Sequence, residues 1–566
     1  MASNPFKVVI LTSVPPHRVA RIMTRIQREA PEAQVAGILY APFLPKTLKK
    51  RFATWRKKGK RLVYWRYVAH RITAATGRSL SALLDALLRF VHAAPRWPNG
   101  KPGDGLAALQ ATCAATQVKL FISPDIHAEP ALDFMRSLNA DLGLVFGTKI
   151  LKPALFEIPK LGSINIHKRK VPDYRGGGAV GLWELLDDQK EIGVTVHRVE
   201  AKVDVGAVFR SALIPIEPFD DLESLALKAA VLGADLIVAT IRDFANGTVT
   251  ETPQVGPSQY FRKPTDEDLL QMKKKLAAQR KSYVPPSRRP AWELLLKSLM
   301  YTVPVTIRNW RRRWQGDFPV MILRHHLVSD RPHPSGVSTV YFLRQVNYLL
   351  RHYRVVSLSE AAEMARKGNV KVKVPTVAIT FDDGYADNFV NLRAVTEETA
   401  LPVGYFIATE YMSSGSEFAH DQQSKQHGFP PNTWEQIEFL KRSGYEIGSH
   451  TRSHADCGSA DEEFLRREIA GSGEDIHQKL GPTAHFSFPF GQPENVSAPA
   501  AAIACASYRN VFSAYGGGNF HSDARRILKR VDFPYTIWEL ELELQSVLTG
   551  DAREPPHLKV RIDEPS

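Results

Sequence analysis

The sequence predicts an α/β protein built as two separate α/β domains, and three observations lead to this prediction. The chain has 566 residues, more than the roughly 100 to 200 residues of a usual domain. Short apolar runs alternate with amphipathic stretches in both halves, as they do in parallel sheets covered by helices. Between the halves, residues 256–318 combine prolines with many basic residues, which is typical of a linker.

We therefore expect four regions along the chain. They are an N-terminal domain at 1–255 with a basic insertion at about 41–100, the linker at 256–318, a second domain at 319–540, and a C-terminal tail at 541–566.

The elements of the first half follow in order. Val8–Leu11 is apolar and mostly β-branched, which predicts a buried strand, and Val19–Ala30 predicts an amphipathic helix. Gln34–Tyr40 predicts a second strand, and beyond the insertion Lys119–Ser123 and Leu142–Phe146 predict two more. Strands that alternate with helices indicate a parallel sheet with both faces covered.

In the second half the strand and helix patterns resume at Val320. The predicted strands after it are Tyr353–Val356, Thr376–Thr380, Val403–Ile407, Glu446–Ser449 and His485–Phe488.

Composition excludes several classes of protein. The 44% of hydrophobic and 23% of charged residues are typical of a folded soluble chain. Three distant cysteines form neither a disulfide framework nor a thiolate zinc site, so we expect a cytoplasmic protein. The N-terminus shows no signal-peptide pattern. We find no run of about 18 apolar residues, and expect the chain to touch a membrane without crossing it.

The positive charge is concentrated in two segments. The net charge is 74 minus 59, or +15; Lys46–Arg71 holds eleven basic residues and no acidic one, and Lys273–Arg313 holds twelve against Glu293. Both segments also contain tryptophan and tyrosine, a mixture that suits peripheral contact with an anionic membrane at its inner face. The same mixture suits RNA, although nucleic acid is the less favoured partner. A solvated helix face followed by a basic linker is the simpler alternative.

The chemistry of the first half centres on Leu161–Gly176. Asn165 and His167 are two residues apart, so on a strand both side chains project from the same face. An amide that can donate to an oxyanion then stands beside an imidazole that can move a proton. Asp204 follows in a turn and can orient or charge the imidazole. By itself, an Asn-x-His pair is more often structural than catalytic.

The flanking residues change that interpretation, because the run from Ala140 to Phe209 resembles the folate-dependent formyltransferase family. This family includes the methionyl-tRNA, glycinamide-ribonucleotide and sugar-amine formyltransferases. The matching motifs are Ile150-Leu-Lys-Pro153, the strand Ile164–His167, Pro172 with Tyr174-Arg-Gly176, Gly193-Val-Thr-Val196, and Asp204-x-Gly206.

The resemblance implies a Rossmann-like domain that uses 10-formyltetrahydrofolate. It implies that Asn165 stabilises the tetrahedral oxyanion, that His167 handles the proton and that Asp204 tunes His167. Cofactor-binding residues stay unassigned. The sequence departs from the family pattern at Lys168-Arg-Lys170, which we expect near the mouth of the active site, in a first loop without a glycine-rich cradle, and in the insertion. The substrate therefore stays open.

The chemistry of the second half centres on two motifs. Asp382 and Asp383 are adjacent at a predicted strand end, so one can bind a metal while the other stays free as a base. His450 and His454 have the i, i+4 spacing that puts two imidazoles on one face of a helical turn. One carboxylate and two imidazoles leave open positions on a metal, as in catalytic sites.

Together with Phe488-Pro-Phe-Gly491 and Arg324-His-His326, these motifs make the region Val320–Pro534 resemble the polysaccharide deacetylase (NodB-homology) superfamily. That resemblance implies a distorted (β/α) barrel. It also implies that Asp382 is the general base and that Asp383, His450 and His454 bind a divalent metal, zinc or similar.

The resemblance assigns further roles. His325 is the expected general acid, with His326 as the competing choice, and the backbone N–H of Phe490 is part of the oxyanion hole. Arg530 and Asp532 match a late strand that would orient the base. The arginine that usually precedes the Phe-Pro-Phe-Gly motif is missing at 485–487, so the orientation of Asp382 stays open.

The joint prediction is a bifunctional enzyme, a formyltransferase and an amide hydrolase, that deacetylates an amino sugar and formylates the amine. The sugar would be linked to a nucleotide or a lipid. Alternatives are formylation followed by deformylation on a carrier, a methionyl-tRNA formyltransferase fused to a deacetylase, and a membrane- or RNA-binding scaffold with degenerate sites.

Overall fold

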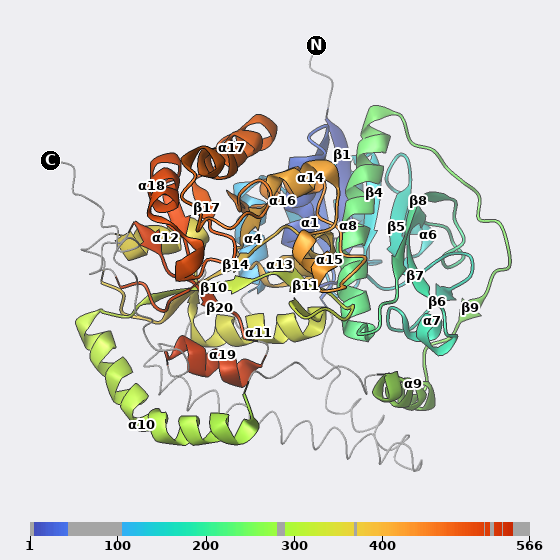
Figure 1. The fold of residues 1–566 in the computed structure, drawn as a ribbon. Helices are drawn as coiled ribbons and strands as arrows, with labels where there is room; N and C mark the ends of the chain where they lie inside the picture. The colour runs from blue at the N-terminus through green and yellow to red at the C-terminus, as the bar shows by residue number, and fades with distance from the viewer. Residues whose placement is uncertain are drawn as a thin grey trace. The chain divides into compact units, whose positions relative to one another are not determined.

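The computed structural model describes residues 5–42, 105–279, 289–366, 371–513, 515–520, 526–534 and 536–546. The basic segment Lys46–Arg71 and most of the predicted insertion lie outside the described residues. The chain divides into two compact units, and the boundary between Ser282 and Tyr283 falls inside the predicted linker (Figure 1).

The first unit is built on a seven-stranded sheet in the order β3-β2-β1-β4-β5-β7-β8. The strands are β1 (Phe6–Thr12), β2 (Ala33–Tyr40), β3 (Lys119–Ile122), β4 (Leu142–Phe146), β5 (Ser163–His167), β7 (Glu191–Arg198) and β8 (Val208–Pro215). The first five pair in parallel, which confirms the predicted parallel sheet. The sequence patterns did not reveal the antiparallel strands β7 and β8 at one edge.

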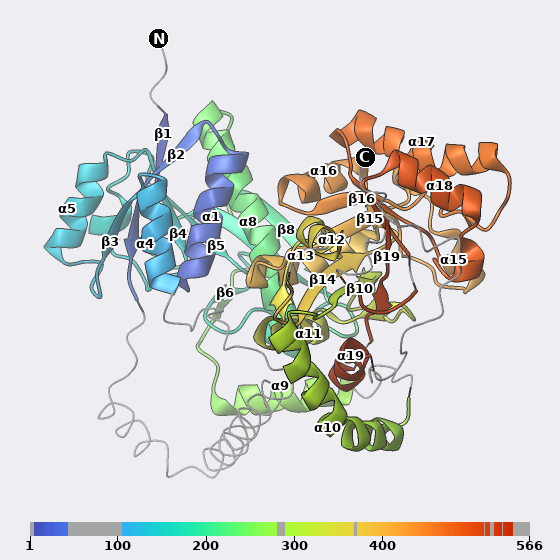
Figure 2. The ribbon, with the colours of Figure 1, turned by 90° about the vertical axis from the view of Figure 1, so that its left-hand side faces the viewer.

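Helices cover both faces of this sheet because β1 is apolar on both sides. Val8 and Ile10 belong to a core with α1 (Pro16–Glu29), α4 (Gly105–Ala115) and α8 (Leu222–Asn246). Val9 and Leu11 point the other way, into a core with α5 (Glu129–Leu138) and α6 (Pro153–Phe156). Figure 2 shows α1, α4 and α8 together on one face.

Helix α8 corrects one expectation, since it is long and apolar enough to cross a membrane by length and composition. About two-thirds of its apolar window, 67%, is buried inside the unit, where Ile237 and Ile241 pack under the sheet. Its apolar character is therefore that of a core helix. Asp221 caps its N-terminus, and the buried Lys228 pairs with the buried Asp220 at 2.9 Å.

The predicted linker is largely helical in its described part. It contains β9 (Tyr260–Phe261), which pairs with β6 (Arg175–Gly176), and α9 (Asp266–Gln279), which contacts α7 (Leu182–Leu186). Helix α10 (Ala291–Gln315) begins directly after Pro290, which serves as its N-cap, and contains Pro304. The prolines suggested irregular structure, but Pro290 stands at a helix start, where a missing N–H costs nothing.

The second unit is a parallel sheet in the order β19-β18-β17-β16-β15-β14-β10-β20, with β13 also paired to β14. Its strands are β10 (Val320–His325), β13 (Arg354–Val355), β14 (Thr376–Phe381), β15 (Gly404–Ile407), β16 (Glu446–Ser449), β17 (His485–Ser487), β18 (Asn510–Phe512), β19 (Ile527–Leu528) and β20 (Val531–Asp532). The outermost strands, β19 and β20, are separated by two residues, so the sheet curls round on itself. This confirms the predicted distorted barrel.

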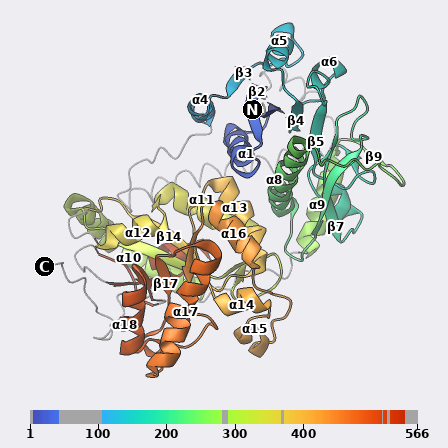
Figure 3. The same cartoon turned by 90° about the horizontal axis from the view of Figure 1, so that it is seen from above.

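Helices surround the curled sheet (Figure 3). They are α11 (Thr339–His352), α12 (Leu358–Arg366), α13 (Asn391–Thr399), α14 (Thr409–Ser414), α15 (Ala419–Gln423), α16 (Trp434–Arg442), α17 (Glu462–Leu480), α18 (Ala498–Ser507) and α19 (Ile537–Leu544). Because all strands run the same way, their carboxyl ends meet at one rim of the barrel.

The buried ion pair of the first unit gives a stability prediction. Lys228→Met leaves the Asp220 carboxylate buried without its cation, and we expect a loss of about 3–5 kcal/mol in the free energy of unfolding. The double variant Asp220→Asn, Lys228→Met removes both charges and should recover most of it. Urea titration of the full chain measures both, with hydrogen exchange of α8 to identify the transition. Equal destabilisation of the single and double variants would contradict the prediction.

Candidate active sites

The first candidate site lies where β5, β7 and the loop after β7 meet. Asn165 and His167 both project from β5, as the sequence predicted, and the Asn165 position pairs with His197 across the sheet. Asp204 lies in the loop between β7 and β8 with a left-handed backbone, φ 54°. The fold thus brings the three predicted residues together and adds His197.

The Asp204 carboxylate stands between two imidazoles. Its Oδ2 is 3.5 Å from Nδ1 of His167, and its Oδ1 is 3.5 Å from Nε2 of His197. The backbone N–H of Gly176 donates to Oδ2 at 3.1 Å and fixes the carboxylate. Asp204 therefore holds two rings at once, where the sequence predicted only His167.

Hydrogen bonds from backbone carbonyls fix both rings. Nε2 of His167 lies 2.8 Å from the Tyr174 carbonyl and Nδ1 of His197 lies 2.8 Å from the Arg198 carbonyl, so each of these nitrogens donates. Nε2 of His197 can then accept from the Asn165 amide, 3.2 Å away. This bond orients the Asn165 amide and leaves its second N–H for another acceptor.

The charges follow from burial. Burial lowers the pKa of His167, against an opposing effect of the Asp204 carboxylate. Burial acts to raise the pKa of Asp204, but the neighbouring imidazoles of His197 and His167 and the hydrogen bond from the Gly176 N–H outweigh burial, so the pKa is lowered. At neutral pH the site holds an ionised Asp204 and a neutral His167 that can accept a proton.

A cavity of about 260 Å³ opens beside this cluster. Asn165, His197 and Asp204 line it, together with 147–151 from the loop after β4 and residues near 199–203. Its wall mixes aliphatic side chains with polar and charged ones, among them Lys149 and Glu200, so a ligand with both apolar and polar parts fits it.

His197 was missed by the sequence reasoning, although it directly follows the motif Gly193–Val196. Its register opposite Asn165 is the signal that could have found it. We expected Arg169 to place positive charge at the mouth of the active site, and this was wrong. Arg169 is buried and donates a hydrogen bond to the Ala179 carbonyl at 2.7 Å. Lys170 pairs with Asp173 at 3.2 Å.

The second candidate site lies at the carboxyl ends of the barrel strands. Asp382 and Asp383 follow β14 directly, and His450 follows β16. Phe490 follows β17 by three residues, and Arg530 stands in the two-residue link between β19 and β20. Residues far apart in the chain meet there because parallel strands end at the same rim.

Three of these side chains form a candidate metal centre. One ligand atom from each of Asp383, His450 and His454 lies within 4.8 Å of the others. Oδ1 of Asp383 is 3.3 Å from Nε2 of His454 and 3.6 Å from Nε2 of His450. Within the described residues this buried oxygen has no hydrogen-bond partner. A buried, unpaired carboxylate oxygen between two imidazole nitrogens fits a divalent cation.

The protonation states support the same conclusion. Nδ1 of His450 donates to the Ser487 carbonyl at 2.8 Å, which leaves Nε2 as the nitrogen with a lone pair facing Asp383. Burial acts to raise the pKa of Asp383, but the electrostatic effect of the nearby His454 imidazole outweighs burial, and the pKa lies well below its ordinary value.

The two histidines are not on a helical turn, as their spacing had suggested. The chain after His450 is irregular, with left-handed backbone at Thr451 (φ 63°) and His454 (φ 57°). These two backbone conformations fold the loop back, so that both imidazoles reach Asp383. A helical turn would also have placed the two imidazoles on one side.

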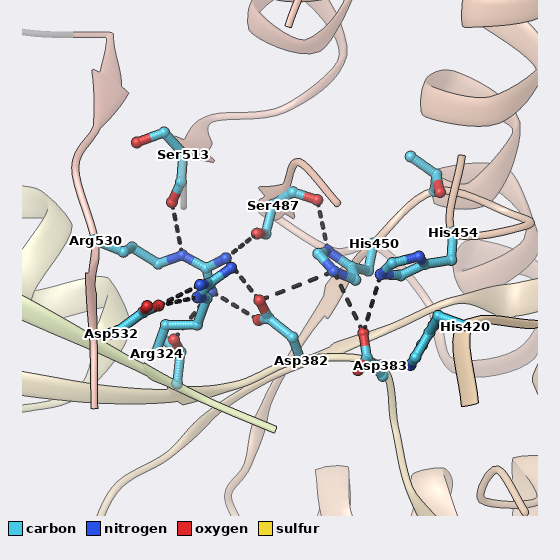
Figure 4. A network of polar contacts seen from close by, with 12 residues as sticks. Arg324, Asp382, Asp383, His420, His450, His454, Ser487, Ser513, Arg530 and Asp532 are labelled. Carbon is cyan, nitrogen blue, oxygen red and sulfur yellow. Dashed lines mark hydrogen bonds and ion pairs between the residues drawn. The ribbon is translucent and has the colours of Figure 1, made fainter. Parts of the chain in front are cut away.

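Asp382 is held by Arg530 through two hydrogen bonds of 2.7 Å each (Figure 4). Burial acts to raise the pKa of Asp382, but the Arg530 charge and its hydrogen bonds outweigh burial and lower the pKa. Asp382 is thus ionised and fixed in orientation. Arg530 fills the role that the missing arginine near 485–487 had left open.

The structure corrects the expectation for Asp532. Its carboxylate accepts a hydrogen bond of 3.0 Å from Nε of Arg324 and a second hydrogen bond from the same guanidinium (Figure 4). It thus holds Arg324, which lines the cavity, whereas Arg530 holds Asp382.

The structure also corrects the choice between the two early histidines. His325 is buried in an aromatic core, stacked on Phe381 with ring centroids 5.2 Å apart, and burial lowers its pKa to about 3. It does not line the site cavity, whereas His326 does. Adjacent strand residues face opposite sides, so only one of the two can face the cavity.

The cavity over this centre measures about 600 Å³. Phe490 lines it with a left-handed backbone, φ 55°, and its N–H has no acceptor among the described residues, as an oxyanion donor requires. His420 from α15 was missed by sequence reasoning, since no motif marks it. Its Nε2 lies 2.9 Å from the Tyr385 hydroxyl and 3.9 Å from Oδ2 of Asp383.

Comparison with protein families matches both units. The formyl transferase family model matches residues 109–241, and the polysaccharide deacetylase model matches residues 369–510.

Individual proteins are similar over part of the chain. A methionyl-tRNA formyltransferase of Thermodesulfovibrio yellowstonii is 36% identical over 187 residues, which is 32% of this chain and 60% of that protein. One from Listeria monocytogenes is 39% identical over 131 residues, 23% of this chain and 41% of that protein. The chain therefore spans about half the length of these relatives. Among solved structures, IcaB from Ammonifex degensii has 22% identity and a TM-score of 0.35, with 41% of this chain and 98% of that chain covered.

The metal centre gives a prediction that needs no substrate. His454→Ala removes one of three ligands, so we expect zinc affinity to fall by at least about 100-fold, more than the loss of an outer hydrogen-bond partner usually costs. Competition with a chromogenic chelator measures the affinity. His427→Ala, a change at an exposed histidine of the same unit, is the control and should bind as the wild type does. Unchanged affinity in His454→Ala would contradict the assignment.

Proposed function

Because the chain joins a formyltransferase domain to a polysaccharide deacetylase domain, we propose that it is a bifunctional enzyme of amino-sugar modification. One unit hydrolyses an N-acyl amide, and the other transfers a formyl group from 10-formyltetrahydrofolate to a sugar amine. One observation carries the proposal: each unit holds its own complete set of reactive groups. These are Asn165, His167 and Asp204 in the first unit, and Asp382 with the three-residue metal centre in the second.

In the first unit the amine of the acceptor attacks the formyl carbon. The free N–H of the Asn165 amide donates to the oxygen that becomes negative, and His197 keeps this amide oriented. His167 takes the proton that the attacking amine loses, and the ionised Asp204 stabilises the resulting imidazolium. The imidazolium then returns this proton to the nitrogen of tetrahydrofolate as the bond between that nitrogen and the formyl carbon breaks, which releases tetrahydrofolate and the N-formyl product.

In the second unit a divalent cation held by Asp383, His450 and His454 would supply Lewis acidity toward water and the amide carbonyl. Asp382 accepts the proton from the attacking water, since Arg530 keeps it ionised and aimed. The N–H of Phe490 donates to the developing oxyanion. His326, which lines the cavity, gives a proton to the leaving amine.

The simplest joint substrate is an amino sugar linked to a nucleotide or a lipid. Hydrolysis of an N-acetyl group leaves a free amine, and a free amine is what formyl transfer consumes. The opposite order, formylation followed by removal of the formyl group on a carrier, uses the same groups. The cavity of about 600 Å³ lies within the usual range for small-molecule sites and would hold one or two sugar rings.

A second candidate is formylation of methionyl-tRNA, which the names of the relatives favour. The matched region is the catalytic part, which the three kinds of formyltransferase would share. The rest of this chain is a deacetylase domain with its own site, and a sugar substrate gives that site a role in the same pathway.

The substrate prediction is tested on the full chain with 10-formyltetrahydrofolate. We expect mass spectrometry to show formyl addition to a UDP-, dTDP- or lipid-linked amino sugar and no formylation of methionyl-tRNA. His167→Ala and Asp204→Ala should each reduce transfer by at least about 100-fold. Both should retain amide hydrolysis, while Asp382→Asn should show the reverse. Formylation of methionyl-tRNA without any reaction on sugars would overturn the proposal.

The Asp382–Arg530 pair gives a prediction on pH dependence. Arg530 lowers the pKa of Asp382, so hydrolysis should fall only when the pH drops below that lowered value. In Arg530→Met the pKa rises by about 1–3 units, and the acidic limb of the kcat/KM profile should move to higher pH by that amount. Arg530→Lys, which keeps a cation but not two parallel bonds, should give a smaller shift. An acidic limb that stays in place in folded Arg530→Met would contradict the assignment.

A further inference from the structure

Helix α10 exposes an unusual amount of apolar surface. Nine of its large apolar side chains have exposed fractions between 47% and 85%. They are Trp292, Leu295, Leu296, Leu299, Met300, Val303, Ile307, Trp310 and Trp314. Contiguous apolar surface of this kind marks a site of contact with a partner or a membrane.

On the wheel of a regular helix these nine residues fall on one side, which we call the apolar stripe. At 100° of rotation per residue they fall within an arc of about 140°, centred near Trp292 and Trp310. The opposite side of the helix carries its buried residues Leu294, Val305 and Asn309. That side is fixed to the barrel unit, since Asn309 donates to the Gln545 side chain at 3.0 Å, just after α19.

A second contact with α19 fixes the first half of the helix, so that the stripe faces away from the unit. The Trp538 indole on α19 donates to Ser298 at 2.7 Å, on the same side as Leu294. Figure 1 shows that α10 bends, and Pro304, which lacks an amide hydrogen, lies in its interior. The helix thus contacts its own unit on one side, where Tyr301 is still 42% exposed, and presents the apolar stripe to solvent.

The charges of α10 identify the kind of partner. The helix contains Lys297, Arg308 and Arg311–Arg313 against a single acid, Glu293, which is bound by Lys297 and Arg289. On the helix circumference Arg311 and Arg313 lie on opposite borders of the apolar stripe. A partner must therefore be apolar at the centre and anionic at the edges.

We propose that α10 binds in the interface of a membrane leaflet that contains anionic lipids, with the apolar stripe among the acyl chains and the border arginines at the headgroups. Three tryptophans in the stripe suit this depth, because an indole is apolar with one polar N–H. The inner leaflet of a cell membrane is anionic, which places the protein on the cytoplasmic side. Binding does not depend on the proposed enzymatic function.

A second copy of the chain is a poorer occupant of the same stripe. Pairing two stripes would bring the border arginines of both copies toward one another, and like charges at an interface are unfavourable. Lipid phosphates remove that repulsion.

Flotation of the full chain with phosphatidylcholine vesicles, with and without phosphatidylglycerol, tests the proposal. We expect flotation only with the anionic vesicles, and a loss as salt is raised, because salt screens the arginine charges. The variant Trp292→Gln, Leu299→Gln, Trp314→Gln should bind at least about tenfold less, and Arg311→Gln, Arg313→Gln should weaken binding as well. The matched control is Leu213→Gln, Val255→Gln, which changes exposed apolar residues of the first unit and should float as the wild type does.

Three outcomes would overturn the proposal. One is equal flotation with neutral and anionic vesicles, and another is flotation unaffected by the triple variant. The third is failure of the wild type to float at low salt, whether light scattering shows a dimer that the triple variant abolishes or a monomer whose stripe is covered by its own chain. Circular dichroism of each variant confirms that these exposed substitutions leave the fold intact.

Discussion

The guanidinium of Arg530 holds the second site together. It has five N–H donors, and all five find acceptors: the Ser513 carbonyl, the Thr380 hydroxyl, the Ser487 hydroxyl and both oxygens of Asp382. Thr380 lies in β14 and Asp382 follows it, Ser487 is the last residue of β17, and Ser513 follows β18. Arg530 itself lies in the link between β19 and β20. A buried cation is costly unless its donors are satisfied, and here satisfying them requires the strand ends to converge. The contacts that bring the strand ends together therefore also position the Asp382 carboxylate.

This pairing also explains how two adjacent buried carboxylates coexist. Asp382 is neutralised by Arg530, whereas Asp383 faces two imidazoles and retains an unpaired oxygen. The environment of Asp382 suits a carboxylate that accepts a proton, and the environment of Asp383 suits one that binds a cation. In the described part of the first unit the Asp204 carboxylate contacts two imidazoles and the Gly176 N–H rather than a guanidinium, so the charge state of the histidines stays adjustable. In the proposed mechanisms a histidine therefore transfers the proton in the first unit, and a carboxylate does so in the second.

The sequence predicted the alternating α/β pattern, the resemblance to both families, and the residues that stand at a strand end in a recognisable motif, such as Asp382 after β14 and His167 at the end of β5. The sequence did not predict the features that depend on tertiary contacts. His197 and His420 reach their sites across a strand pair and from a short helix, without a motif of their own. His325 and His326 are neighbours, and only the direction of β10 tells which one faces the cavity. Helix α10 was taken for a linker because its apolar residues face solvent rather than a core, a pattern that sequence periodicity cannot assign to a partner.

The order of the units along the chain connects the membrane proposal with the choice of carrier. A deacetylated sugar on a free nucleotide leaves its site by diffusion, and joining two enzymes in one chain does little to retain it. A sugar on a lipid carrier stays at the membrane surface after the first reaction. Helix α10 begins at Ala291, nine residues after the first unit ends at Ser282, so a membrane-bound α10 keeps both units near that surface. Each site is complete by itself, so confinement to one surface is enough to couple them. The exposed stripe thus favours a lipid-linked substrate over a soluble one.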